Sequence, residues 1–85
     1  MTLENKVVII TKSKCPKCDE LINKLDSKEI QYNKIDANSK TGLSLIKENC
    51  IFFTPTILVF NQNNELIFQN NNFEEFCNIF NIPID

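Results

Sequence analysis

Apolar residues along the chain fall first into a short β-branched run and then into helical spacing. The run at residues 6–11 predicts a buried strand, because it is short, β-branched and followed by polar residues. From Cys18 to Leu25, apolar side chains recur at positions i, i+3, i+4 and i+7, which predicts an amphipathic helix over residues 16–27. A strand followed directly by a helix indicates a crossover to a second, parallel strand.

The next segments repeat this order with weaker patterns. Residues 30–35 predict a half-buried strand, and cap and turn residues then precede a helix predicted over residues 39–49. Gly42, the only glycine of the chain, should weaken this helix slightly. The expected core contacts of the helix are Leu43, Leu45 and Ile46.

The final third of the chain predicts a hairpin and a last helix. Residues 56–60 form a strongly β-forming run, residues 61–64 have the composition of a turn, and residues 65–69 alternate as the partner strand. Residues 72–75 have the pattern of a capping box that opens a helix, and Pro83 should end that helix. The phenylalanines of the chain are expected in the core. The expected inner face of the last helix consists of Phe73, Phe76, Cys77 and Phe80.

The predicted order of elements is therefore β-α-β-α-β-β-α, an α/β fold. The first βαβ unit should be parallel and right-handed, and the hairpin adds two antiparallel strands. This order predicts a four-stranded mixed sheet with helices on both faces. The chain has 85 residues, of which 42% are hydrophobic, so we expect one domain over residues 1–85 and no second core.

The overall charge and the lack of long apolar stretches limit the classes of partner. A net charge of −2 argues against nucleic acid, because phosphate binding needs a basic surface. No stretch approaches the roughly 20 apolar residues of a membrane span, and the first residues lack the pattern of a signal peptide. We therefore expect a cytoplasmic monomer that has no nucleic-acid or membrane partner.

Two cysteines stand where the first strand gives way to the first helix, in the motif Cys15-Pro16-Lys17-Cys18. If Cys15 caps the helix and Pro16 is its first residue, the unpaired N–H groups of the first turn point toward the Cys15 sulfur. The helix dipole and nearby ammonium groups then favour the thiolate, which is the species that attacks disulfides. These ammonium groups belong to Lys12, Lys14 and Lys17.

The spacing assigns a different role to each cysteine of the motif. Cys15 should attack a substrate disulfide, and Cys18, one turn inside the helix, should be shielded and resolve the mixed disulfide. The alternative of a structural zinc site needs two further ligands, and Cys50 and Cys77 form no second Cys-x-x-Cys motif. We expect those two cysteines to be small apolar core residues or exposed bystanders, and we expect no metal site.

Together these features resemble the thioredoxin superfamily and, within it, the glutaredoxin branch. The resemblance rests on the cysteine motif after the first strand, on Lys12 three positions before it, on Thr54-Pro55 before the third strand, and on the order of elements. It implies the thioredoxin fold, with Pro55 as a cis-proline that faces the cysteines. It also implies that the backbone of Thr54 pairs with an extended substrate segment.

In glutaredoxins the backbone after the last strand approaches glutathione. Asn71 and Asn72 stand where that family carries a Gly-Gly pair, and Glu74 stands where it carries an Asp that meets the glutathione amine. The resemblance thus implies glutathione as a candidate co-substrate and no tightly bound cofactor. The residues that it places at this binding site are Lys12, Lys17, Thr54, Pro55, Asn71, Asn72 and Glu74.

These observations predict a thiol–disulfide oxidoreductase that reduces protein disulfides or glutathione mixed disulfides. The strand after Pro55 is similar to the corresponding strand of thioredoxin, so the electron donor is open between glutathione and thioredoxin reductase. One alternative is a redoxin that takes electrons from thioredoxin reductase and delivers them to ribonucleotide reductase. Another is a non-enzymatic carrier of a metal or an iron–sulfur cluster.

Overall fold

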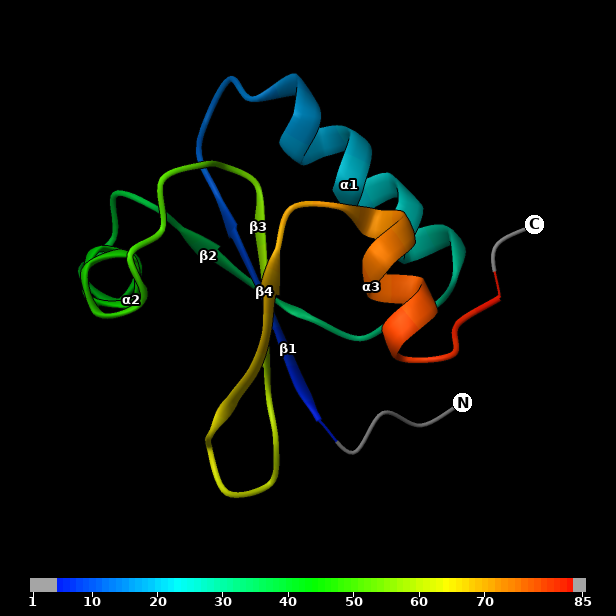
Figure 1. The fold of residues 1–85 in the computed structure, drawn as a ribbon. Helices are drawn as coiled ribbons and strands as arrows, with labels where there is room; N and C mark the ends of the chain where they lie inside the picture. The colour runs from blue at the N-terminus through cyan, green and yellow to red at the C-terminus, as the bar shows by residue number, and fades with distance from the viewer. Residues whose placement is uncertain (1–4, 84–85) are drawn as a thin grey trace.

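The computed structural model describes residues 5–83 and contains three helices and four strands within that range (Figure 1). In chain order these are β1 (Lys6–Thr11), α1 (Pro16–Ser27), β2 (Asn33–Asp36), α2 (Lys40–Asn49), β3 (Thr56–Phe60), β4 (Leu66–Asn70) and α3 (Phe73–Ile79). This confirms the predicted order of elements. Residues 1–4, on which the expectation that there is no signal peptide partly rests, and residues 84–85 lie outside the described part of the chain. Within residues 5–83 no helix combines the length and the apolar character that are needed to cross a membrane.

The four strands form one mixed sheet in the order β2-β1-β3-β4. Strand β1 runs parallel to β2 and antiparallel to β3, and β3 runs antiparallel to β4. Helices α1 and α3 cover one face of the sheet and α2 covers the other (Figure 1). The predicted α/β fold, with a mixed sheet and helices on both faces, is therefore confirmed.

The central strands β1 and β3 divide the core into two layers, because successive side chains of a strand point to opposite faces. The layer toward α1 and α3 contains Val7, Ile9, Leu21, Leu25, Ile57, Val59, Phe68, Phe76 and Cys77. The layer toward α2 contains Val8, Ile10, Ile51 and Leu58. The unbroken apolar runs of these two strands thus reflect burial on both faces of the sheet.

The second strand begins later than predicted, at Asn33 rather than at residue 30. The Ile30 N–H donates to the Leu25 carbonyl oxygen at 3.1 Å, which holds the chain against the end of α1. The Tyr32 hydroxyl donates to the Asp26 carboxylate at 2.9 Å. Ile30 and Tyr32 pack against the α1 and α3 layer from this connection, so their burial comes from a helix end and not from strand pairing.

Helix α2 begins after Ser39, close to the predicted position, but Leu43 was wrongly predicted to contact the core. The Leu43 side chain is 56% exposed, whereas Leu45 and Ile46 pack against the α2 layer. Only one narrow side of a ten-residue helix can meet the sheet, and Leu43 lies outside that side.

Helix α3 opens as predicted and ends early. The Asn72 side chain accepts a hydrogen bond from the Glu75 N–H at 3.0 Å, which confirms the cap. The Glu75 carboxylate accepts from the Asn70 side chain at 2.9 Å instead of returning to the cap residue. The helix ends at Ile79, ahead of Pro83, because the chain turns into a left-handed conformation at Asn81, with φ of 55°.

The turn between β3 and β4 is built on one asparagine side chain. The amide oxygen of Asn61 accepts hydrogen bonds from the N–H groups of Asn63 and Glu65, both at 2.9 Å. Glu65 therefore belongs to the turn, and β4 begins one residue later than predicted, at Leu66.

Gly42 occupies a position where a side chain does not fit, a requirement that its expected slight weakening of α2 did not include. A Cβ atom there would overlap the Asp36 carbonyl oxygen, which already accepts hydrogen bonds from the N–H and the hydroxyl of Ser39. We expect Gly42→Ala to lower the free energy of unfolding by about 1–3 kcal/mol, as overpacking does. On helix propensity alone the same change would raise stability by about 1 kcal/mol.

Urea unfolding followed by circular dichroism measures this difference. The matched control is Ser44→Ala, at an exposed position of the same helix, which should change stability by less than about 0.5 kcal/mol. A stabilised Gly42→Ala variant would show that α2 can move away from Asp36 without cost.

Candidate active site

Several chain segments meet at one edge of the sheet. Ile10 pairs with Thr56 across β1 and β3, and Ile57 pairs with Asn70 across β3 and β4. The segment after β1, the segment before β3 and the segment after β4 therefore share this edge, where α1 and α3 also begin (Figure 1). Site residues predicted on these segments are Lys12, Cys15, Thr54, Pro55, Asn71 and Asn72. The fold thus brings together residues that are up to 60 positions apart in the sequence.

Cys15 is the N-cap residue of α1, as predicted from the motif. Its sulfur accepts a hydrogen bond from the Cys18 N–H at 3.2 Å, and Pro16, which has no N–H, is the first helical residue. The Cys15 carbonyl oxygen accepts from the N–H groups of Cys18 and Asp19. The positive end of the helix is therefore directed at the Cys15 sulfur, an arrangement that stabilises negative charge there.

The two cysteines are joined in a disulfide, with their Cα atoms 5.2 Å apart. Cys15 is 8% exposed and Cys18 is 2% exposed, so Cys15 offers the more accessible sulfur. Within residues 5–83 the buried polar side chains are Thr11 and Thr56, and no buried carboxylate occurs. Charge at this site is therefore controlled by backbone N–H groups and by exposed lysines rather than by a buried acid.

The three lysines around the motif are exposed, at positions 12, 14 and 17. Lys12 and Lys14 lie between β1 and α1, and Lys17 lies in the first turn of α1. Lys14 adopts a left-handed backbone conformation, with φ of 55°, where the chain turns from the strand into the helix. These lysines place exposed positive charge on the segments directly before and after Cys15.

The peptide bond between Thr54 and Pro55 is cis, as the resemblance to thioredoxins and glutaredoxins implies. Pro55 is buried and Thr54 is half-buried. The Thr56 hydroxyl donates to the Phe53 carbonyl oxygen, which fastens the preceding segment to the start of β3. Because Thr56 pairs with Ile10, this segment lies at the edge of the sheet that carries the cysteines.

Asn71 and Asn72, predicted to approach glutathione, also lie at this edge, but their backbone N–H groups already form hydrogen bonds within the protein. The side-chain oxygen of Asn70 accepts hydrogen bonds from the N–H of Asn71 at 2.7 Å and from the N–H of Asn72 at 3.1 Å. The Asn72 side chain serves as the cap of α3. Glu74 is exposed in the first turn of that helix. The sequence pattern did not reveal that Asn70 occupies these two N–H groups.

The remaining cysteines differ from each other in burial. Cys77 is fully buried in the α1 and α3 layer, and burial raises the pKa of its thiol, so it is a small core residue as expected. Cys50 is exposed and ends α2 in a left-handed conformation. Among residues 5–83 no three cysteine, aspartate or glutamate side chains come close enough together to hold a metal ion.

Phe52 and Phe53 correct the expectation that the phenylalanines lie in the core. Their side chains are 83% and 68% exposed, whereas Phe68 and Phe76 are buried. The two exposed rings stand directly before Thr54, outside any strand or helix. Sequence reasoning missed them because it treated aromatic side chains as core, although no periodic pattern includes this pair.

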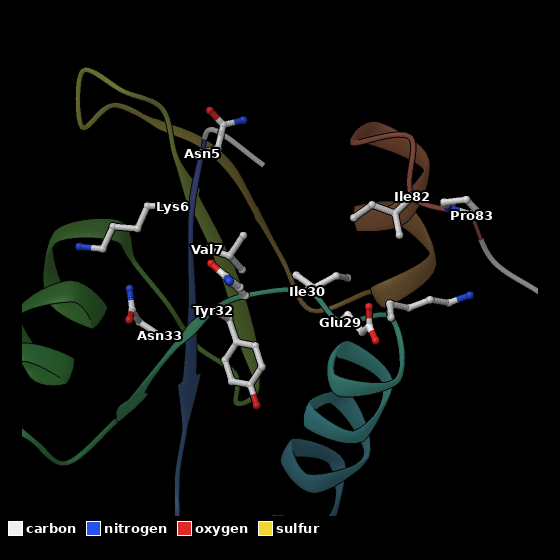
Figure 2. Close-up of a pocket in the computed structure, with 11 residues that line it drawn as sticks. Asn5, Lys6, Val7, Glu29, Ile30, Tyr32, Asn33, Ile82 and Pro83 are labelled. Atoms are coloured by element: carbon white, nitrogen blue, oxygen red, sulfur yellow. The ribbon is translucent and has the colours of Figure 1, made fainter. Parts of the chain in front are cut away.

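A separate cavity of about 890 Å³ lies at the opposite edge of the sheet, where β1 and β2 begin (Figure 2). The described residues that line it include charged, amide and apolar side chains but no cysteine. Tyr32 is one of them, and burial, together with its hydrogen bond to Asp26, raises the pKa of the Tyr32 hydroxyl. This cavity does not belong to the candidate active site.

No protein-family model and no curated protein matches the sequence. The structure is similar to solved thioredoxins. Thioredoxin f2 of Chlamydomonas reinhardtii matches with a TM-score of 0.73 and 16% identity over 92% of this chain and 77% of that chain. The short form of thioredoxin f from spinach chloroplasts matches with a TM-score of 0.75 and 16% identity over 92% of this chain and 74% of that chain.

Deadhead, a germline-specific thioredoxin of Drosophila melanogaster, matches with a TM-score of 0.72 and 16% identity over 92% of this chain and 79% of that chain. At this level of identity the similarity concerns the fold. The cysteine pair at the helix start and the cis-proline segment share one edge of this fold, which suggests thiol–disulfide redox chemistry. The chain therefore has the thioredoxin fold.

Proposed function

We propose that this protein is a dithiol oxidoreductase that reduces disulfide bonds in other proteins, with Cys15 as the nucleophile and Cys18 as the resolving thiol. The observation that supports this most directly is the position of the Cys15 sulfur as the cap of α1, where it accepts the Cys18 N–H. After reduction of the disulfide, the same N–H groups and the nearby lysines favour a thiolate at Cys15. That thiolate is the attacking species in disulfide exchange.

The reaction follows from the two positions. The Cys15 thiolate attacks one sulfur of the substrate disulfide, so a Cys15–substrate bond forms while the substrate disulfide breaks and its other sulfur takes a proton. Cys18, as a thiolate, then attacks the Cys15 sulfur and releases the second substrate sulfur, which also takes a proton. Two electrons pass to the substrate, and the Cys15–Cys18 disulfide results.

The proton of Cys18 needs an acceptor during the second step. No carboxylate is buried within residues 5–83, so the proton passes to water or to the departing substrate sulfur. This arrangement makes resolution depend on access of water or substrate to a sulfur that is 2% exposed.

For the electron donor, we favour a protein reductase of the thioredoxin reductase class over glutathione. If the protein bound glutathione as glutaredoxins do, the backbone at Asn71 and Asn72 would approach it. Both backbone N–H groups already donate hydrogen bonds to the Asn70 side-chain oxygen. A ligand carboxylate would have to displace a bond that the protein makes within itself. In addition, one structure of similar fold holds thioredoxin f2 in a complex with ferredoxin:thioredoxin reductase.

The test offers the oxidised protein either glutathione with glutathione reductase or thioredoxin reductase, each with NADPH, and adds insulin as the protein disulfide. We expect insulin reduction and NADPH consumption in both arms to require this protein, and to be faster with thioredoxin reductase. Faster reduction with glutathione would overturn the assignment of the donor. No insulin reduction, even by protein first reduced with dithiothreitol, would overturn the function. A coloured dimer in protein purified without oxygen would identify a cluster carrier instead.

A further inference from the structure

We propose that Phe52, Phe53 and the lysines near Cys15 form a docking surface for client segments that carry an apolar residue and acidic residues beside their disulfide. This inference rests on the proposed reductase function and names the class of its protein substrates. Surface phenylalanines that form an adjacent pair need an explanation, because large apolar side chains beside an active centre mark interaction sites. Here the exposed fractions are 83% and 68%.

The exposed pair is held in place on both sides. On one side, the buried Ile51 donates its N–H to the Ile46 carbonyl oxygen at 3.0 Å, which ties the segment to the end of α2. On the other side, the Thr56 hydroxyl donates to the Phe53 carbonyl oxygen. The aromatic rings therefore project from an anchored segment, and a partner would bind them without a large cost for ordering the chain.

A hollow next to the pair offers room for a side chain of the partner. It has a volume of about 320 Å³ and lies between residues 50–53 and the end of β4. Its wall combines the two phenylalanines with the polar groups of Gln69, Asn70 and Asn71. The Gln69 side chain donates to the Asn49 carbonyl oxygen at 3.0 Å, which joins the two walls. An apolar side chain of a client would thus contact the two rings in a hollow whose side-chain N–H groups at Gln69 and Asn70 already have partners within the protein.

Positive charge gathers in the segment that carries Cys15, although the whole chain has a net charge of −2. Residues 12–17 contain three exposed lysines and no acidic residue. The acidic side chains near this edge lie on other segments: Asp19 in the first turn of α1, Asp36 at the end of β2, and Glu74 and Glu75 in the first turn of α3. The lysines, in contrast, stand directly before Cys15 and within the cysteine motif, and they place positive charge next to it in the sequence. A client with Asp or Glu near its disulfide would complement this charge and meet the site faster.

The same charges argue against a second copy of this chain as the occupant. In a symmetric dimer each surface meets the same surface of the other copy, so the three lysines of both copies would lie within one interface. Like charges in such an arrangement oppose association. An acidic client segment, in contrast, can use the apolar pair and the lysines together.

The experiment uses four peptides that carry the same disulfide, with either Leu or Ser on one side and either Asp or Lys on the other. The reduced protein is mixed with each peptide, and second-order rate constants are measured. We expect the Leu–Asp peptide to react at least about tenfold faster than the Ser–Lys peptide at low salt. Added salt should reduce the preference for Asp and leave the preference for Leu.

Two variants separate the parts of the surface. In the double variant Phe52→Ser/Phe53→Ser, the Leu and Ser peptides should react with nearly equal rate constants, so that their ratio falls to about one. The preference for Asp over Lys should persist. In Lys14→Glu the preference for Asp should decrease, while the preference for Leu persists. The matched control is Ile79→Ser, which removes an apolar side chain that is 54% exposed on α3 and should keep both ratios.

The outcomes distinguish this proposal from the proposed function. Equal rate constants for all four peptides would overturn the docking surface and leave the reductase function in place. If Ile79→Ser also lost the preferences for Leu and for Asp, the docking surface would be overturned, because the loss of any exposed apolar side chain would then have the same effect. If the reduced protein reacts with none of the peptides and with no small aromatic disulfide, the reductase function itself is wrong. Circular dichroism melting curves check that each variant is folded.

Discussion

Replacing Cys15 with Ser is expected to lower the rate of protein disulfide reduction by at least about a thousandfold, because a hydroxyl group does not replace a thiolate in disulfide exchange. Cys15 is the more exposed cysteine of the pair and accepts the N–H at the start of α1. The measurement is insulin reduction with NADPH and the reductase, at equal concentrations of folded protein.

Two further cysteine variants serve as controls for this result. Cys18→Ser should still attack a disulfide and should accumulate a mixed disulfide with the substrate, visible as added mass in intact-protein spectra. Cys50→Ser changes an exposed cysteine outside the motif and should still reduce disulfides through Cys15 and Cys18. If Cys15→Ser and Cys18→Ser lose activity equally in every assay and neither traps substrate, the division of roles between the two cysteines is wrong.

Replacing Phe76 with Ala is expected to lower the free energy of unfolding by about 3–5 kcal/mol, the range for losing a fully buried phenylalanine. Phe76 is 0% exposed at the centre of an aromatic cluster. Its ring centroid lies 5.3 Å from that of Phe80 and 5.9 Å from that of Phe68. Because this cluster joins α3 to the sheet, its loss leaves a cavity that the small domain cannot refill. Urea unfolding of the oxidised protein measures the effect.

Phe52→Ala is the matched control within the same chain. It removes the same ring from a position that is 83% exposed, so it should change stability by less than about 0.5 kcal/mol. Equal losses in the two variants would show that Phe52 packs against the protein in solution. That result would also contradict the docking surface, because the ring would then be unavailable to a client.

Local sequence patterns predicted most of the elements and their order. Strands β1 and β3 follow from β-branched runs, and α1 follows from apolar spacing, because each pattern depends on residues within one or two turns of each other. The caps at Cys15 and Asn72 were also predictable, since a cap requires only the first turn of its own helix. The same local information placed Cys15 at the helix start, and the resemblance implied the cis bond before Pro55.

Some residues with similar sequence patterns have different structural roles, and contacts between distant segments determine which role each residue has. Ile30 and Tyr32 alternate like strand residues, yet they pack from the connection after α1. Leu43 is a large apolar residue of the kind usually found in a core, yet its side chain is exposed because α2 packs against the sheet with another side. Gly42 was expected to be a weak point, but the approach of the Asp36 carbonyl oxygen makes its missing side chain necessary.

Local sequence patterns were sufficient to predict the elements, their order, the helix start at the cysteine motif and the fold that these imply. Tertiary structure alone decided that Phe52 and Phe53 are exposed and that they share an edge of the sheet with Cys15. The hydrogen bonds from the N–H groups of Asn71 and Asn72 to the Asn70 side chain are local, but the pattern of cap residues did not indicate them. Periodicity and capping depend on neighbours along the chain, whereas the exposure of a side chain depends on how distant segments pack against it.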